Sequence, residues 1–170
     1  MGKHGWDPDQ KALPNSTVNS VDPFLLLHHA EFSFKTDLPA IKQGLGPHPH
    51  KGFSPVTFVI KGEVHYRDSW GNSQITSAGE VQWMNAGAGI IHSERPSQKL
   101  AEEGGIQEVV QLWINAPAAK KMIPPSYQYL PKSSVPTSTS PDQKIVTKII
   151  AGQVGEHIST NRTETDLLIL

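Results

Sequence analysis

The sequence predicts an all-β fold, a sandwich or barrel built from short strands. Runs of β-branched and aromatic residues, each five or six residues long, recur through the middle of the chain with turn residues between them. The 170 residues include 14 glycines and 14 prolines, more than average usage, which favours turns over long helices. Short strands at regular spacing are typical of sandwiches and barrels.

The expected strands lie between residues 24 and 114. The first is the apolar run 24–27, after which residues 28–47, with their prolines and glycines, predict a loop. The later runs are rich in valine, isoleucine and aromatic residues and predict strands at 56–60, 64–68, 81–84, 90–94 and 109–114. The only helical pattern is about one turn at 118–122, which two prolines stop.

Changes in composition divide the chain into four parts. Residues 1–20 are polar and turn-rich, and we expect an N-terminal leader that packs loosely or as an edge segment. Residues 21–130 form the main domain, and 131–143 (PKSSVPTSTSPDQ) have the composition of a linker. Residues 144–170 hold two further strand patterns, 144–151 and 165–170, and the sequence stops inside the second.

Composition excludes several classes of protein. The 15 basic and 16 acidic residues give a net charge of −1, which argues against a dedicated DNA-binding domain. No apolar run approaches the roughly 18 residues of a membrane span, and no signal peptide is visible. Cysteine is absent, which excludes disulfides and zinc–thiolate sites. We expect a cytoplasmic protein, or a nuclear one in a eukaryote, with no direct contact to nucleic acid or membrane.

Two short motifs carry the candidate chemistry. His48-Pro49-His50 and His92-Ser93-Glu94 both have side chains two residues apart, which point to the same face of a strand. On adjacent strands facing inward, they would place three imidazoles and one carboxylate around one point. This donor set suits iron, manganese, nickel, copper or zinc. On a six-coordinate metal it leaves two positions open, as catalysis requires.

Each motif also has an ordinary structural interpretation. A single His-x-His or His-x-Glu pair is common, so it is the two pairs together, each beside glycine-rich turns, that favour a metal site. His65 and His157 are interpreted as surface or packing histidines. Of His28 and His29, at most one can face the interior, because adjacent strand residues point in opposite directions.

Longer stretches around these motifs resemble the pirin family. They are DPFLLL from residue 22, PHPHKGF from residue 47, VQWMNAGAGIIHSE from residue 81, QLW from residue 111 and MIPPSYQ from residue 122. The similarity covers roughly residues 20–155. Pirins are cupins with two antiparallel β-barrels, of which the N-terminal one holds a metal. The resemblance therefore implies a cupin (double-stranded β-helix, or jelly-roll) barrel for residues 21–130.

The resemblance also implies a ligand set and a metal. His48, His50, His92 and Glu94 match the four ligands of pirins, and the implied metal is Fe(II), with nickel, manganese, copper or zinc as alternatives. The general cupin pattern adds a glutamate four residues after the second histidine. Ser54 stands there, so Glu94 has to supply the carboxylate. Glu94 is also the expected catalytic base, released from the metal when substrate binds.

Three aromatic residues are candidates for the pocket wall. Phe53 follows the histidine pair by three residues and is expected beside the metal. Trp83 and Trp113 are expected in the core, with a place in the pocket as the alternative. Gly87 and Gly89 are expected to form the tight turn that aims His92 inward.

Some pirins are quercetin 2,3-dioxygenases, so the resemblance implies an iron-dependent dioxygenase acting on a small aromatic, flavonol-like substrate with O2. The alternatives are a non-catalytic iron-binding module that regulates a partner protein, as in animal pirins, and a degenerate truncated cupin without activity. Residues 144–170 correspond only to the start of a second cupin. A homodimer is therefore expected as one way to complete the barrel wall.

Overall fold

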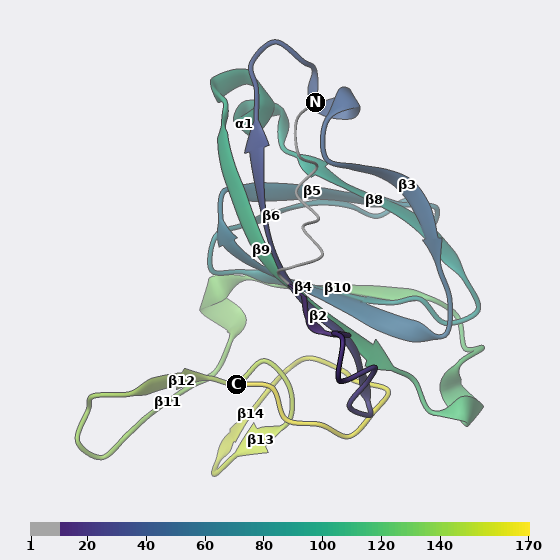
Figure 1. Ribbon diagram of the computed structural model, residues 1–170. Helices are drawn as coiled ribbons and strands as arrows, with labels where there is room; N and C mark the ends of the chain where they lie inside the picture. Colours follow the sequence, from purple (N-terminus) through teal and green to yellow (C-terminus); the bar gives the residue numbers. More distant parts are fainter. Residues whose placement is uncertain (1–10) are drawn as a thin grey trace.

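The computed structural model describes residues 11–170, and most of it is an antiparallel β-barrel made of two facing sheets (Figure 1). The all-β prediction is confirmed. The larger sheet contains, in spatial order, β1 (Lys11–Leu13), β2 (Phe24–Phe34), β9 (Gly105–Asn115), β4 (Phe53–Lys61), β7 (Val81–Asn85) and β10 (Ser126–Leu130). The smaller sheet contains β3 (Leu45–His50), β8 (Ile90–Pro96), β5 (Glu63–Asp68) and β6 (Ser73–Ser77).

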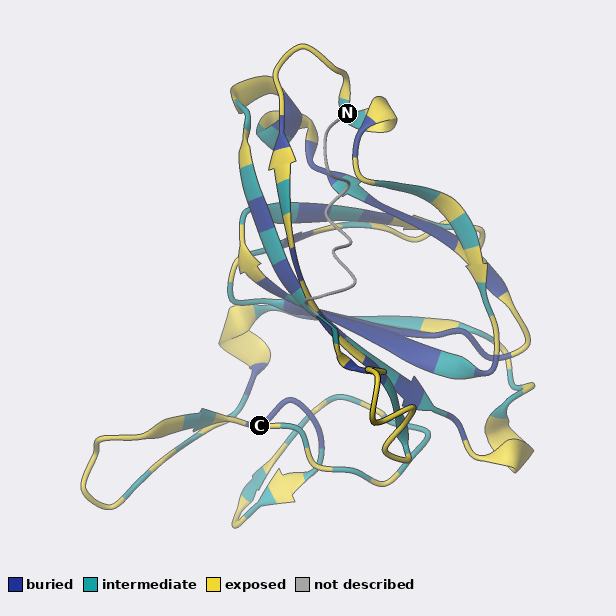
Figure 2. Cartoon of the chain, viewed as in Figure 1, coloured by how far each residue is buried: buried dark blue, intermediate teal, exposed yellow. Residues whose placement is uncertain are grey.

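The larger sheet is covered on both faces. Between the two sheets lie small clusters of buried apolar side chains, such as Val59, Val64 and Val109. A second, larger core covers the opposite face of β4, β7 and β9, where Val56 and Trp83 pack against the C-terminal part of the chain. Figure 2 shows the resulting dark band of buried residues through the middle of the molecule. Successive residues of these strands therefore point alternately into the barrel and into the outer core.

Residues after β10 form small hairpins over the outer core. They comprise η4 (Lys132–Ser134), β11 (Thr137–Thr139), β12 (Val146–Lys148), β13 (Gln153–Val154) and β14 (His157–Ile158). β11 pairs with β12, so the stretch 131–143 carries part of a hairpin where a linker is expected. In the expected strand 165–170, only Ile169 is paired, in an isolated bridge to Ala151. The division into domains stays a prediction.

The expected loop at 28–47 is shorter than predicted. β2 continues to Phe34 and β3 begins at Leu45, leaving a connection that holds only η2 (Ala40–Lys42). The reason lies in the alternation of β2, in which His28 and Ala30 are buried while His29 and Glu31 are exposed. A strand with polar outward residues lacks the continuous apolar run on which the prediction relied.

The chain also contains elements that the sequence did not predict. α1 (Gln98–Glu103) starts at Ser97, whose side chain accepts a hydrogen bond from the backbone N–H of Leu100. It is too short for its periodicity to be recognised.

The helical turn that the sequence predicts at 118–122 is present as η3 (Ala118–Lys120). Within residues 11–170, no helix combines the length and the apolar character that a membrane crossing demands.

The turn between β7 and β8 requires glycine. Gly87 has φ +45°, and a Cβ on it would overlap the backbone carbonyl oxygen of Ile123. The Asn85 side chain closes the turn by accepting a hydrogen bond from the Gly87 N–H at 3.1 Å. This turn fixes where β8 begins, and therefore the phase with which His92 faces the interior.

Candidate metal centre

Three histidines from two paired strands meet at one point. β3 runs antiparallel to β8 with His48 opposite His92, and His50 lies two residues further along β3. One ring nitrogen from each of His48, His50 and His92 lies within 4.8 Å of the other two. The two histidine motifs thus lie on adjacent strands, which is the condition for one shared site. We refer to these three residues as the histidine triad.

The buried member of the histidine triad fits a metal ligand. His92 is only 3% exposed, and neither of its ring nitrogens has a hydrogen-bond partner within residues 11–170. A buried polar atom without a partner is costly, and coordination of a divalent cation would satisfy it. His48 donates from Nδ1 to the carbonyl oxygen of Gly46 at 2.8 Å, which leaves its Nε2 available as a ligand atom.

The electrostatics of the site keep the imidazoles of His50 and His92 neutral. Burial, followed by the neighbouring imidazoles His92 and His48, lowers the pKa of His50 to about 4. Burial and His48 lower the pKa of His92 to about 3, against an opposing effect of Asp68. Both rings therefore hold free lone pairs at neutral pH, as metal ligands must.

These pKa values predict how the stability of the metal-free protein depends on pH. Both lie below the ordinary value of 6.5, so the unfolded chain binds more protons than the folded chain between about pH 6.5 and pH 4. The free energy of unfolding should therefore decrease as the pH falls through this window. Urea titrations of chelator-treated protein at several pH values measure it. Replacing both His50 and His92 by glutamine should flatten the pH dependence, and an equally steep dependence in that variant would contradict the assignment.

Glu94 lies in the same interior but outside the histidine triad. It is 6% exposed and follows His92 by two residues on β8, so the two side chains share a face. Its Oε1 accepts hydrogen bonds from Thr57 Oγ1 at 2.9 Å and from Gln82 Nε2 at 2.5 Å. Its Oε2 accepts one from Gln111 Nε2 at 2.9 Å. Three donors therefore fix the carboxylate within the barrel.

The three donors form one row across the larger sheet. Thr57 of β4 lies opposite Gln82 of β7 on one side and opposite Gln111 of β9 on the other. We call Thr57, Gln82 and Gln111 the polar row. Sequence reasoning missed it, although each member is a polar residue within an apolar strand. Such residues occupy inward positions only when they have buried partners, and Glu94 is the partner here.

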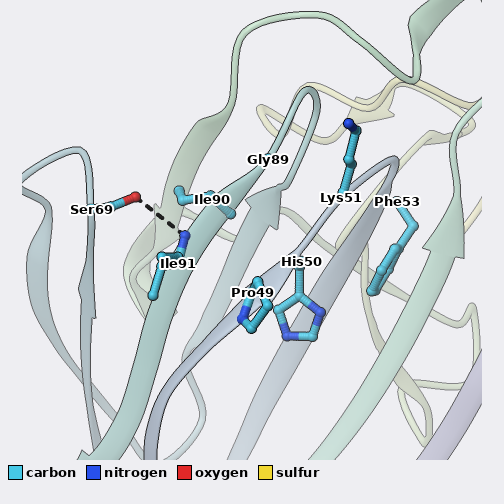
Figure 3. Close-up of a pocket in the computed structure, with 8 residues that line it drawn as sticks. All are labelled: Pro49, His50, Lys51, Phe53, Ser69, Gly89, Ile90 and Ile91. Atoms are coloured by element: carbon cyan, nitrogen blue, oxygen red, sulfur yellow. Dashed lines mark hydrogen bonds between the residues drawn. The ribbon is translucent and has the colours of Figure 1, made fainter.

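An open depression lies beside His50 (Figure 3). It has a volume of about 490 Å³ and is lined by Pro49, His50, Lys51, Phe53, Ser69, Gly89, Ile90 and Ile91. In Figure 3 the Lys51 side chain points away from the imidazole of His50. The depression thus joins one face of the histidine triad to the surface.

The three candidate aromatic residues lie in different places. Phe53 lines the depression, and its ring centroid is 5.1 Å from that of His50. Trp113 lies behind it, 5.3 Å from His50 and 4.7 Å from Phe53, and donates from Nε1 to Gln111 Oε1. Trp83 belongs to the outer core on the opposite face of the sheet and is 2% exposed. The structure brings Phe53 and Trp113 to the site and leaves Trp83 outside it.

The comparison with protein families decides the identity of this β-barrel. The family described as Pirin matches residues 7–114. The chain belongs to the pirin family. Three similar proteins extend the match.

One relative is a Pseudomonas aeruginosa protein, provisionally named a quercetin 2,3-dioxygenase, with 40% identity over 91% of this chain and 54% of its own length. A quercetin 2,3-dioxygenase from Acinetobacter baumannii superposes with a TM-score of 0.78 at 38% identity, over 90% of this chain and 53% of the other. A bacterial pirin from Escherichia coli in complex with nickel(II) gives a TM-score of 0.59 at 27% identity, over 76% and 52%. These matches confirm the cupin fold, and the chain spans about half the length of the curated relatives it matches.

In this pirin-family chain, a pair of stacked tyrosines also lies beside the triad. The Tyr66 ring centroid lies 5.4 Å from that of His92, and Tyr66 stacks on Tyr127 at 4.2 Å. The Tyr66 hydroxyl donates to Asp68 Oδ2 at 2.8 Å, and burial together with this carboxylate raises the pKa of Tyr66. Tyr66 therefore stays a neutral phenol that packs beside His92.

The other described histidines are not members of the triad. His28 is fully buried on β2 opposite Gln111, whereas His29 is exposed and contacts Glu108 at 2.8 Å. One of the two thus faces the interior, as the alternation predicts. His65 lies on the outer face of β5, and His157 lies in β14. His4 lies outside the described residues.

Proposed function

We propose that the histidine triad and Glu94 hold one divalent metal, Fe(II) by expectation, in an enzyme that cleaves a flavonol-like aromatic substrate with O2. The observation that carries this proposal is the double role of His50. Its ring belongs to the triad, and it also lines a depression open to the surface. A metal held there would be within reach of a small molecule, as a catalytic metal must be and a structural one need not be.

The lining of the depression favours a flat aromatic ligand. Pro49, Phe53, Ile90 and Ile91 supply apolar contacts, while His50 supplies the edge next to the metal. Apolar walls with a few converging polar groups are typical of sites for small organic molecules. The bound metal would supply electrostatic activation of the substrate oxygens and of O2. Phe53 and Trp113 would orient the aromatic rings by stacking.

Glu94 is the proposed fourth ligand and proton acceptor. Its carboxylate, next to the three imidazoles of the triad, complements a divalent cation. The polar row holds both carboxylate oxygens, so Glu94 would have to exchange one of these hydrogen bonds for contact with the metal or with a substrate hydroxyl. In the second case a carboxylate oxygen would accept the hydroxyl proton.

The comparisons support the dioxygenase over the other candidates through the names of relatives. Two of the proteins described above are named as quercetin 2,3-dioxygenases, and the nickel(II) complex of the Escherichia coli pirin supports a metal in this family. The substrate in these names is that of the named proteins. It motivates quercetin as the probe for this chain.

The test combines metal analysis with O2 consumption. Protein purified without chelator is analysed for metal and then supplied with quercetin and O2. We expect about one iron per chain and metal-dependent O2 uptake that chelation abolishes and Fe(II) restores. Replacing Phe53 by alanine should raise KM for quercetin while leaving the metal content unchanged. Bound metal without O2 uptake would contradict the dioxygenase, and absence of metal would contradict the metal centre itself.

One observation favours the regulatory module as the second candidate. An apolar groove of about 560 Å³ lies outside the barrel and includes Val21, Leu27, Leu168 and Leu170, which are all at least 37% exposed. A partner protein bound through an iron-containing module would need such a surface. The metal and O2 measurements above separate this candidate from the enzyme.

A further inference from the structure

The strands that carry the metal centre present a different set of side chains to the outside of the barrel. On β8, Ser93 and Arg95 alternate with the inward-facing His92 and Glu94. On the neighbouring β5, His65 lies opposite Arg95, and Arg67 lies opposite Ser93. These four residues line a surface depression of about 140 Å³, together with Ala40, Ile41, Pro96 and Gln98. We call it the outer depression.

The outer depression brings together two arginines that form no salt bridge with any described residue. Within residues 11–170, neither Arg67 nor Arg95 has a carboxylate oxygen within 4.0 Å. Arg67 donates from Nε to His65 Nε2 at 3.2 Å, and Arg95 donates from Nη1 to the carbonyl oxygens of Ile41 and Gln43. These acceptors are neutral. Basic residues gathered on adjacent strands repel one another, so an anion between them would be stabilising.

The two acidic residues nearest in sequence on β5 have other partners. The Glu63 carboxylate accepts a hydrogen bond from the hydroxyl of Ser97. The Asp68 carboxylate accepts from the hydroxyl of Tyr66, from the backbone N–H of Trp70, and from both the backbone and the side chain of Asn72. Both carboxylates are thereby held by partners other than the two arginines.

Ser93 supplies an independent observation. It is only 8% exposed, and its hydroxyl makes no hydrogen bond within the described part of the chain. It lines the outer depression and also an adjoining one of about 230 Å³, which Arg67 and Asp68 line too. The Ser93 hydroxyl oxygen keeps contact with solvent, so its O–H is available to donate to a group bound in the depression.

We propose that the outer depression binds a small oxyanion, a phosphate or carboxylate group, through Arg67, Ser93 and Arg95. A guanidinium offers parallel N–H donors that match two oxygens of such a group, and a serine hydroxyl can donate to a third. Arg95 is held in place by the carbonyl oxygens of Ile41 within η2 and of Gln43 directly after it, so its position needs little ordering when the anion binds. The volume of about 140 Å³ exceeds the roughly 30 Å³ share of a single water molecule, which leaves room for such a group.

Calorimetric titration tests the proposal with inorganic phosphate in one arm and succinate in the other, in chloride buffer of constant ionic strength. The Arg67→Gln variant removes one guanidinium that is exposed and makes a single hydrogen bond, so its fold should be preserved. Lys148→Gln is the matched control, because it removes the same charge from the exposed hairpin of β11 and β12. His50→Ala, which disrupts the metal centre, separates the outer depression from phosphate bound at a metal.

We expect saturable binding in at least one arm with a dissociation constant on the order of 1 mM or below. Saturation by phosphate alone identifies a phosphate group, and saturation by succinate alone identifies a carboxylate. Arg67→Gln should weaken the binding by at least about tenfold, because hydrogen bonds to charged groups are among the stronger ones. Lys148→Gln and His50→Ala should bind as the unmodified protein does. Absence of saturation in both arms, unchanged binding by Arg67→Gln, or loss of binding in His50→Ala would each overturn the proposal.

Discussion

Replacing His50 by alanine is expected to remove the bound metal and with it any metal-dependent O2 uptake. His50 is one of the three imidazoles of the histidine triad, and its ring centroid lies 4.8 Å from that of His92. The variant keeps only two imidazoles, His48 and His92, beside the proposed ligand Glu94, and Glu94 is already held by hydrogen bonds to the polar row, so the ion loses a nitrogen donor that nothing nearby replaces. Metal content should fall from about one ion per chain to a trace, a loss of at least about 100-fold in affinity.

Thermal unfolding with and without added Fe(II) distinguishes loss of metal from loss of fold. A ligand that binds only the folded state raises the unfolding temperature by an amount that grows with the logarithm of its concentration divided by its dissociation constant, so unmodified protein should be stabilised and His50→Ala should not. His29→Ala is the matched control, because His29 is exposed and its imidazole contacts Glu108 rather than the triad. Retention of a full equivalent of iron by His50→Ala would show that the metal lies elsewhere.

Replacing Glu94 by glutamine is expected to damage both stability and metal affinity. All three neighbours of this carboxylate donate to it, namely Thr57, Gln82 and Gln111. A glutamine offers only one acceptor oxygen, and its amide N–H groups would face other donors. At least one buried donor would lose its partner, at a cost of about 1–3 kcal/mol in the free energy of unfolding. Loss of the negative charge should also weaken metal binding by about 10- to 100-fold.

Urea denaturation and metal titration measure the two effects separately. Glu108→Gln is the control, since Glu108 is on β9 and pairs with His29 away from the metal centre. A Gln111→Glu exchange combined with Glu94→Gln tests the polar row directly, because it restores one carboxylate among the same neighbours. If Glu94→Gln kept full metal content, full stability and full turnover, Glu94 would be neither a ligand nor a base.

The histidine triad was predictable because it depends on local rules. Residues two apart on a strand share a face, so His48 and His50 had to point together, and the same holds for His92 and Glu94. That the two strands pair is a long-range fact, since β3 and β8 lie about 40 residues apart. The family resemblance supplied it, because the resemblance implied one ligand set drawn from both motifs.

The polar row was not predictable, because it depends on long-range packing and not on local rules. Thr57, Gln82 and Gln111 are single polar residues in apolar strands, and nothing local marks them as neighbours. Their meeting depends on the register of β7, β4 and β9, which tertiary packing sets. Trp83 and Trp113 illustrate the same difficulty. Because the larger sheet is buried on both faces, an inward tryptophan can belong to either interior, and composition cannot distinguish them.

The position of β3 at the edge of its sheet has a consequence for local opening. β3 pairs only with β8 in that sheet, and it carries two of the three histidines, while β8 carries the third. Edge strands are usually among the first segments to open in native-state hydrogen exchange. An ion held by His48, His50 and His92 would cross-link the two strands. β3 could then separate from β8 only after the ion had dissociated. Protection of the β3 amides would then be a direct reading of metal occupancy.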